Sequence, residues 1–321
     1  MGRSKSALRI WLEYLAFLPL LFMVRILPLR FTDRVAEVVG KIAFALLRRA
    51  RERSVRHVLL AGLTESRSDA RRLARQSFVN LAQTGIEFLK LDQFVRRFDA
   101  RAALCGALRA KRDGKLEAAL RSPKGLIVVG AHFGNWEVAG QLFSTTERPL
   151  SCVVRPLDNP KLNALLERWR ERFHQKTVDK RGALKELLRV LRRGEGVALL
   201  VDQRANRAEG VMTTFFGRPA LTHPAPALLH LKTEAPLVVG VAKRVSGCFN
   251  FEFDLRGPLE VERSGDGEAD VRELAQLYTM EIESIIRADP EQWLWPARRW
   301  EETRGHRAPA SSGGAQPSST G

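Results

Sequence analysis

The stretch GLIVVGAHFGNWE, residues 125–137, decides the fold of this chain. Its first half is apolar and rich in β-branched residues, which is typical of a buried strand. Gly130 then allows the backbone to turn, and Gly134-Asn135 provide loop and N-cap chemistry for a helix. We therefore predict a buried strand, a tight turn and a helix that begins at about Trp136.

This arrangement places His132 where the strand ends and Glu137 in the first turn of the next helix. In open α/β sheets, ligands bind at the carboxyl ends of the strands. An imidazole and a carboxylate five positions apart across a tight turn can come within hydrogen-bond distance. We predict that His132 takes a proton from a hydroxyl, while Glu137 holds the ring tautomer and stabilises the imidazolium. The alternative is structural, with His132 capping the strand and Glu137 favoured by the helix dipole.

The composition favours an anionic partner. The 321 residues carry 53 basic and 36 acidic side chains, a formal net charge of +17. Such an excess suits nucleic acid, an acidic membrane surface or a phosphorylated ligand. We find no zinc spacing, no aromatic-basic pattern and no recognition helix, which argues against nucleic acid. Cys105, Cys152 and Cys248 are far apart, so we expect a reducing compartment, no metal and no cofactor.

An apolar run over residues 10–24 is interrupted by Glu13 and Pro19 and has basic residues on both flanks. A full membrane span needs about 20 apolar residues. We predict a membrane-attached helix, shallow or short-spanning, with the bulk of the protein on the cytoplasmic side. A buried core helix is the alternative. The basic cluster at 48–56 suits anionic lipid headgroups or a solvated face.

We divide the chain into a membrane-attached helix at 1–31, a domain at 32–300 whose first part is helical, and a disordered tail at 301–321, rich in Ala, Pro, Ser and Gly. The fold class that we predict is α/β, with a mixed central sheet flanked by helices. After the first strand we predict, in order, a strand at 150–155, helices at 160–174 and 183–193, a strand at 197–202, a polar loop at 205–221, a helix at 224–233, strands at 236–242 and 249–254, and a helix at 268–287.

Three of the predicted strands end in polar residues, namely His132, Arg155 and Asp202. If these strands are parallel neighbours, their carboxyl ends meet at one edge of the sheet. The convergence of the three side chains is stronger evidence for a site than any one of these residues alone.

The chain resembles the bacterial lipid A biosynthesis acyltransferases, the lauroyl/myristoyl group among the lysophospholipid acyltransferases. The resemblance covers roughly residues 8–302 and is carried by four features: HFGNWE at 132–137, Arg155-Pro156 to Asn159-Pro160, Arg181-Gly182 leading to Asp202-Gln203 with Phe216-Gly217 beyond, and EQWLW at 291–295 ending in Arg298-Arg299-Trp300.

The resemblance implies a glycerolipid acyltransferase-like fold and transfer of a fatty acyl chain from a thioester carrier to a hydroxyl of a lipid A precursor. The carrier is acyl carrier protein or coenzyme A, and the location is the cytoplasmic face of the bacterial inner membrane. His132 becomes the general base and Glu137 its partner. The residues it places at the substrate are Arg155, Asn159, Arg181, Asp202, Gln203 and Phe216.

Physical chemistry agrees with this reaction, because an acyl thioester is already activated and needs a base and oxyanion donors only. We expect these donors to be backbone N–H groups near Gly134-Asn135. Four aromatic residues either line an acyl channel or pack in the core: Phe215, Phe216, Trp293 and Trp295.

Two rival interpretations remain at this point. The first keeps the chemistry and moves the acceptor to another glycolipid, such as a phosphatidylinositol mannoside. The second is a basic membrane-binding protein without enzymatic activity.

Overall fold

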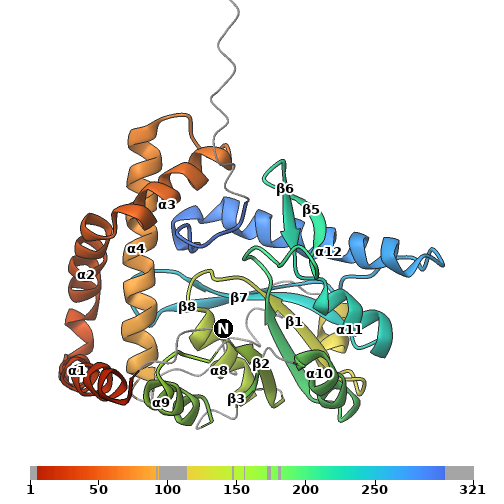
Figure 1. Ribbon diagram of the computed structural model, residues 1–321. Coiled ribbons are helices and arrows are strands. Elements are labelled where there is room, and N and C mark those ends of the chain that lie inside the picture. The colour runs from red at the N-terminus through yellow and green to blue at the C-terminus, as the bar shows by residue number, and fades with distance from the viewer. Residues whose placement is uncertain are drawn as a thin grey trace, which may run out of the picture.

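The computed structural model describes residues 6–91, 93, 114–146, 148–154, 156–171, 175–179 and 182–300. A six-stranded sheet lies at its centre, in the order β3-β2-β4-β1-β7-β8 (Figure 1). The first five strands are parallel to their neighbours and β8 is antiparallel, so the predicted mixed α/β sheet is confirmed. The strands are β1 (Leu126–Gly130), β2 (Leu150–Val154), β3 (Gln175–Asp179), β4 (Gly196–Leu200), β7 (Leu237–Arg244) and β8 (Phe251–Arg256).

Helices cover both faces of the sheet, which explains why every residue of β1 is buried. Ile127 and Val129 pack in the core formed with α10, α11 and α12. Leu126 and Val128 point to the opposite face and pack with α7 and α8. These helices span Gly114–Leu120 (α7), Trp136–Thr146 (α8), Ala183–Arg192 (α10), Ala225–Thr233 (α11) and Gly267–Ala288 (α12).

The register between β1 and β4 positions the site. Gly130 of β1 pairs with Leu200 of β4, and the two strands run in the same direction. His132 and Asp202 each follow two residues later, so the chain places them side by side at the carboxyl edge of the sheet. The predicted convergence of strand ends is confirmed for this pair.

The N-terminal part is helical, as predicted, and Figure 1 shows it along one edge of the molecule. Helix α2 packs against α4 through Gly40, where a Cβ atom would lie only 2.5 Å from the Cα of Val79. Among the described residues, α1 alone is long and apolar enough to cross a membrane. The elements are α1 (Ala7–Ile26), η1 (Leu29–Phe31), α2 (Thr32–Leu46), α3 (Arg48–Leu60), α4 (Arg67–Leu89), α9 (Pro160–Glu171) and η2 (Pro290–Gln292).

The prediction of a loop at 205–221 is wrong for its second half. Strands β5 (Val211–Phe215) and β6 (Arg218–Thr222) form an antiparallel hairpin there. Phe216 and Gly217 make its two-residue turn, and both have positive φ, the geometry that tight hairpins favour. The hairpin escapes sequence analysis because Phe is an unusual residue at a left-handed position.

Several predictions fall outside the described residues. The sequence also predicts a helix over about 103–120 before β1, and only its second part is described, as α7. Arg155, Arg181, Cys105 and the tail at 301–321 also lie outside. The predicted domain boundaries stay predictions.

Candidate active site

His132 is held by Asp202 at the carboxyl edge of the sheet. Its Nδ1 atom lies 2.8 Å from Oδ1 of Asp202, and its backbone N–H donates to Oδ2 over 2.8 Å. The indole Nε1–H of Trp293 also donates to Oδ2, over 2.8 Å. The Asp202 side chain is fully buried, whereas one fifth of the His132 side chain is exposed. The arrangement therefore fixes the ring and leaves one side of it accessible.

The partners of His132 indicate its tautomer. A carboxylate accepts hydrogen bonds, so Nδ1 carries the hydrogen and Nε2 keeps the lone pair. The Nε2 atom lies 3.3 Å from the side-chain amide nitrogen of Gln203. Burial lowers the pKa of His132, but the charge and hydrogen bond of Asp202 raise it by more, so the net direction is upward. Burial raises the pKa of Asp202, and the charge and hydrogen bond of His132 more than offset it, so the net direction is downward.

Glu137 does not fill the place that the sequence predicts for it. Its Oε1 and Oε2 atoms accept hydrogen bonds of 2.7 and 3.2 Å from the guanidinium of Arg170, on α9. Because Nδ1 of a neutral imidazole carries a single hydrogen, one carboxylate can hold it, and Asp202 does so. Glu137 remains near enough for its charge to help raise the pKa of His132.

The turn between His132 and α8 is tightly enclosed. Gly134 has φ +57°, and a Cβ atom there would lie 1.9 Å from the carbonyl oxygen of Ala242. The side chain of Asn135 accepts the N–H of Val138 over 3.0 Å, the N-cap role that the sequence predicts.

We predict oxyanion donors among the backbone N–H groups near Gly134-Asn135, and the N–H groups of these two residues are already engaged. They donate to the carbonyl oxygens of Gln292 and Ala242, each over 3.1 Å. The first two N–H groups of α8, those of Trp136 and Glu137, have no acceptor within a helix that starts there.

A buried polar network holds this turn in place by hydrogen bonds. Glu87 on α4 accepts a hydrogen bond of 2.7 Å from the side chain of Asn135, and its other oxygen lies 2.5 Å from Arg244 Nη1 on β7. Asn80 accepts from Arg244 and donates to the carbonyls of Gly134 and Gln292. Burial raises the pKa of Glu87 even against the opposing charge of Arg244.

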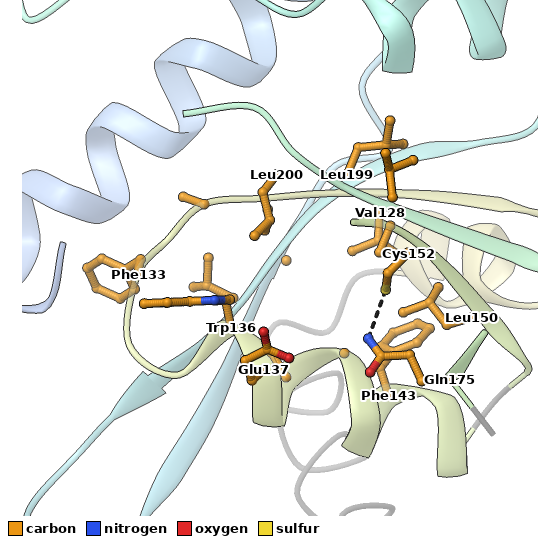
Figure 2. A pocket seen from close by; sticks show the side chains of 18 of the residues that line it. Val128, Phe133, Trp136, Glu137, Phe143, Leu150, Cys152, Gln175, Leu199 and Leu200 are labelled. Carbon is orange, nitrogen blue, oxygen red and sulfur yellow. Dashed lines mark hydrogen bonds between the residues drawn. The ribbon is translucent and has the colours of Figure 1, made fainter. Parts of the chain in front are cut away.

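An apolar pocket lies between α8 and the sheet, next to the turn that carries His132, although His132 itself is not among its lining residues (Figure 2). Its empty volume is about 790 Å³, counting the open mouth. Trp136 and Glu137 lie at one end, and the His132 ring contacts Trp136 with 5.1 Å between ring centroids. At the other end are Phe143, Leu150, Cys152 and Gln175.

Asn159 and Phe216 lie away from His132. The side chain of Asn159 caps α9 and donates to the carbonyl oxygen of Ile10 over 2.9 Å and to Glu13 over 3.1 Å. Phe216 is buried against Trp295, Trp300 and Arg287. These contacts give both residues structural roles, and their binding of substrate stays a prediction.

The aromatic residues near the C-terminus form part of the core. Trp293 and Trp295 are fully buried, and Phe215 and Phe216 pack against them. None of the four is among the residues that line the pocket. Trp293 instead supports the site through the backbone. It forms a β-bridge with Phe133, and the N–H of the next residue, Leu294, donates to the carbonyl oxygen of His132 over 3.0 Å.

Sequence analysis missed Arg170, Glu87 and Arg244. None belongs to a motif, and the side chain that each one bonds is more than 30 positions away in the chain: Glu137 for Arg170, Asn135 for Glu87, and Glu87 for Arg244. The only available signal was their charge within helices and strands that are otherwise partly apolar. Among the described residues, no group of three or more His, Cys, Asp or Glu side chains is placed to hold a metal ion.

Comparisons with known proteins identify the family of this chain. Residues 2–302 match the family described as bacterial lipid A biosynthesis acyltransferase. The chain is 24% identical over 269 residues to a lipid A biosynthesis palmitoleoyltransferase of Escherichia coli (strain K12), covering 82% of each chain. It is also 24% identical over 180 residues to a lipid A biosynthesis acyltransferase of Haemophilus influenzae, covering 56% of this chain and 55% of the relative. The chain is therefore an acyltransferase that belongs to the bacterial lipid A biosynthesis acyltransferase family.

Proposed function

We propose that this acyltransferase moves a fatty acyl chain from a thioester donor to a hydroxyl group of a lipid A precursor, with His132 as general base. The observation that carries the proposal is the His132–Asp202 pair beside an apolar pocket. The pair supplies a base with a fixed tautomer, and the pocket suits a hydrocarbon chain. Family membership supports the acceptor class.

The reaction needs one proton carrier. Nε2 of His132 takes the proton of the acceptor hydroxyl as its oxygen attacks the thioester carbonyl carbon. The carbon–sulfur bond then breaks, and the imidazolium returns the proton to the departing thiolate. Asp202, whose carboxylate stays ionised, stabilises the imidazolium between these two steps.

The start of α8 supplies the remaining groups. The N–H groups of Trp136 and Glu137 point out of the helix N-terminus, where the helix dipole favours negative charge. They are the donors that we assign to the developing oxyanion. We assign Glu137 a changed role in the site, because it fixes Arg170, which lines the pocket. Arg170 then offers positive charge to an anionic substrate.

The substrates also fit the charge of the chain. Lipid A precursors are phosphorylated, acyl carrier protein is acidic, and coenzyme A carries phosphates, so a net charge of +17 favours all three. The apolar helix α1 supports an enzyme that works at the cytoplasmic face of the inner membrane, where such lipids are made.

Lipid mass spectrometry tests the proposal directly. A strain without this gene, complemented by wild type or by His132→Ala, should regain a missing acyl chain on lipid A only with wild type. The purified His132→Ala protein should transfer acyl chains roughly 1,000-fold more slowly, the typical contribution of a general base. Circular dichroism verifies that the variant folds.

Three outcomes would contradict the proposal. A folded His132→Ala protein with full activity would remove the base. Unchanged lipid A with an altered glycolipid of another class would keep the chemistry and replace the acceptor. No lipid change in a strain without a redundant enzyme would favour a membrane-binding protein instead.

A further inference from the structure

Helix α1 is fastened to the folded domain at both of its ends. Near its start, the buried side chain of Asn159 donates to the carbonyl oxygen of Ile10 and to Glu13. At its C-terminal end, the ammonium group of Lys90 donates to the carbonyl oxygens of Val24, Arg25 and Leu27, over 2.7–3.0 Å. The side chain of Gln93 donates to Arg25 as well. A buried lysine that caps a helix C-terminus stabilises it by charge and by hydrogen bonds.

Helix α9 follows α1 along its length. At the N-terminal ends of both helices, the Lys161 ammonium lies 3.5 Å from the centre of the Trp11 ring. At their C-terminal ends, the Arg25 guanidinium lies 6.0 Å from the centre of the Trp169 ring. The two helices therefore run parallel, and Figure 1 shows them side by side.

These contacts are incompatible with a helix that crosses the bilayer. The two tied ends, at Ile10 and Val24, are about 21 Å apart along the helix axis. If α1 crossed a hydrocarbon layer about 30 Å thick, α9 would have to enter it too. Helix α9, which packs against α1, carries Glu167, Arg168 and Arg170, and charged groups within the hydrocarbon layer are costly.

The free side of α1 is a continuous apolar stripe. Leu8, Leu12 and Leu15 are each more than half exposed, and so are Phe22, Met23 and Ile26. Their spacing of three and four residues puts them on one helix face. Glu13 and the buried Leu21 lie on the opposite side, toward the domain.

Helix α2 carries a second stripe. Val38, Ile42 and Leu46 are 52–75% exposed, on the face opposite to the one that packs on α4, and Phe31, directly before α2, is 39% exposed. Figure 1 shows α1 and α2 together along one edge, outside α4 and α9, so both stripes face away from the same body.

Basic residues border this surface and indicate what covers it. Arg34 and Lys41 are exposed beside the α2 stripe. Arg48 and Arg49 follow directly after its end and line a hollow with Arg53 and Arg56. Apolar side chains rimmed by cations fit the acyl region and the anionic headgroups of a lipid leaflet.

We infer that α1 and α2 form one membrane-docking face, on which α1 lies in the plane of the leaflet and does not span it. The face deepens the proposed function, since it rests on the membrane association stated there. The enzyme then contacts a single leaflet, and α1 and α2 hold the catalytic domain against the membrane surface.

Protease accessibility separates the two orientations of α1. The full chain carries one epitope before residue 1 and another after residue 321. We expect both epitopes to resist protease in intact spheroplasts and both to be digested in inverted membrane vesicles. Digestion of the N-terminal epitope alone in spheroplasts would show a spanning helix and overturn the inference.

Vesicle binding tests the α2 stripe. The substitution pair Val38→Ser/Ile42→Ser should weaken binding of the full chain to phosphatidylglycerol–phosphatidylethanolamine vesicles roughly tenfold, because both side chains lose apolar burial. The matched control is Met212→Ser/Met280→Ser, at residues of nearly equal exposure on β5 and α12. Equal binding by both variants would overturn the docking face, as would a change in self-association without a change in vesicle binding.

The two proposals fail separately. With substrates dispersed in detergent, Val38→Ser/Ile42→Ser should keep wild-type turnover, since it touches no group in the active site. An active His132→Ala protein would refute the base and leave the membrane result standing.

Discussion

Two edges of this molecule differ from the usual pattern of a soluble protein, in which charged groups are exposed and apolar groups are buried. At the carboxyl edge of the sheet, charged and polar groups are buried, and Glu87, Arg244 and Asp202 all lie in the interior. At the α1–α2 edge, apolar side chains such as Phe22 and Leu46 are more than half exposed. Buried charge is costly unless it is paired, and exposed apolar surface is costly unless it is covered.

The difference teaches what each edge requires. The buried groups already have partners within the chain, so the site is organised before substrate arrives. The exposed stripes have none on their outer side, so that edge needs something outside the chain. The proposed catalysis therefore depends on hydrogen bonds within the chain, whereas the proposed membrane docking depends on lipid outside it.

The largest expected effect tests the buried side of this comparison. Arg244→Met leaves Glu87 without its ion-pair partner in the interior, which should lower the free energy of unfolding by about 3–5 kcal/mol. Chemical denaturation measures it. The matched control is Lys41→Met, which removes the exposed partner of Glu37 and should leave the denaturation midpoint unchanged.

The double variant Glu87→Leu/Arg244→Met sharpens this test. Replacing both partners by apolar residues avoids the unpaired charge, so it should be more stable than Arg244→Met alone. A double variant that is less stable than the single one would show that the network acts through shape rather than charge.

A matched pair of carboxylate-to-amide changes compares the two acids near His132. Asp202→Asn should lower kcat roughly 100-fold or more, because the amide cannot hold the tautomer or stabilise the imidazolium. Glu137→Gln should cost clearly less, because Glu137 bonds Arg170. Steady-state kinetics with saturating donor measures both values of kcat. A larger loss of kcat in Glu137→Gln than in Asp202→Asn would restore Glu137 as the partner of His132.

The pocket gives a prediction of selectivity. A Cβ atom at Gly140 would lie 2.5 Å from the Gln175 side-chain nitrogen and 3.7 Å from the Cys152 sulfur. Gly140→Val should therefore shorten the pocket and shift the preference toward shorter acyl chains by roughly tenfold. Competition between donors of different length, read by mass spectrometry, measures it. Gly85→Val, at a helical glycine with open space, should leave the preference unchanged.

The smallest expected effect is a shift in pH dependence. His132 acts as a base only when neutral, and its pKa is raised, so kcat/KM should fall as pH decreases through a value above the usual 6.5. In Asp202→Asn the raising charge is lost, so the acid limb should move to lower pH. An unchanged limb would show that another group titrates.

The same shift links the pair to stability. Because the folded-state pKa of His132 is raised, its ion pair stabilises the fold fully below the unfolded pKa. That stabilisation is lost as pH rises through the folded pKa.

Much of the site was readable from local sequence. The strand before His132, the Asn135 cap and the start of α8 depend on residues that are neighbours in the chain. The meeting of His132 with Asp202 followed from two apolar runs that end in polar residues. The hairpin at β5–β6 was missed because its turn uses Phe216 at a position that favours glycine or asparagine.

The sequence by itself determined the α/β sheet, the position of His132 at a strand end and the apolar character of α1, because periodicity and turn residues are local properties. Only the tertiary structure decided that Asp202 holds His132, that Glu137 binds Arg170 and that Asn159 and Lys90 fasten α1. Each of these choices depends on which groups meet in space. The single Nδ1 hydrogen of a neutral histidine bonds the acceptor that the strand register places beside it. The spacing of residues along the chain does not reveal that register.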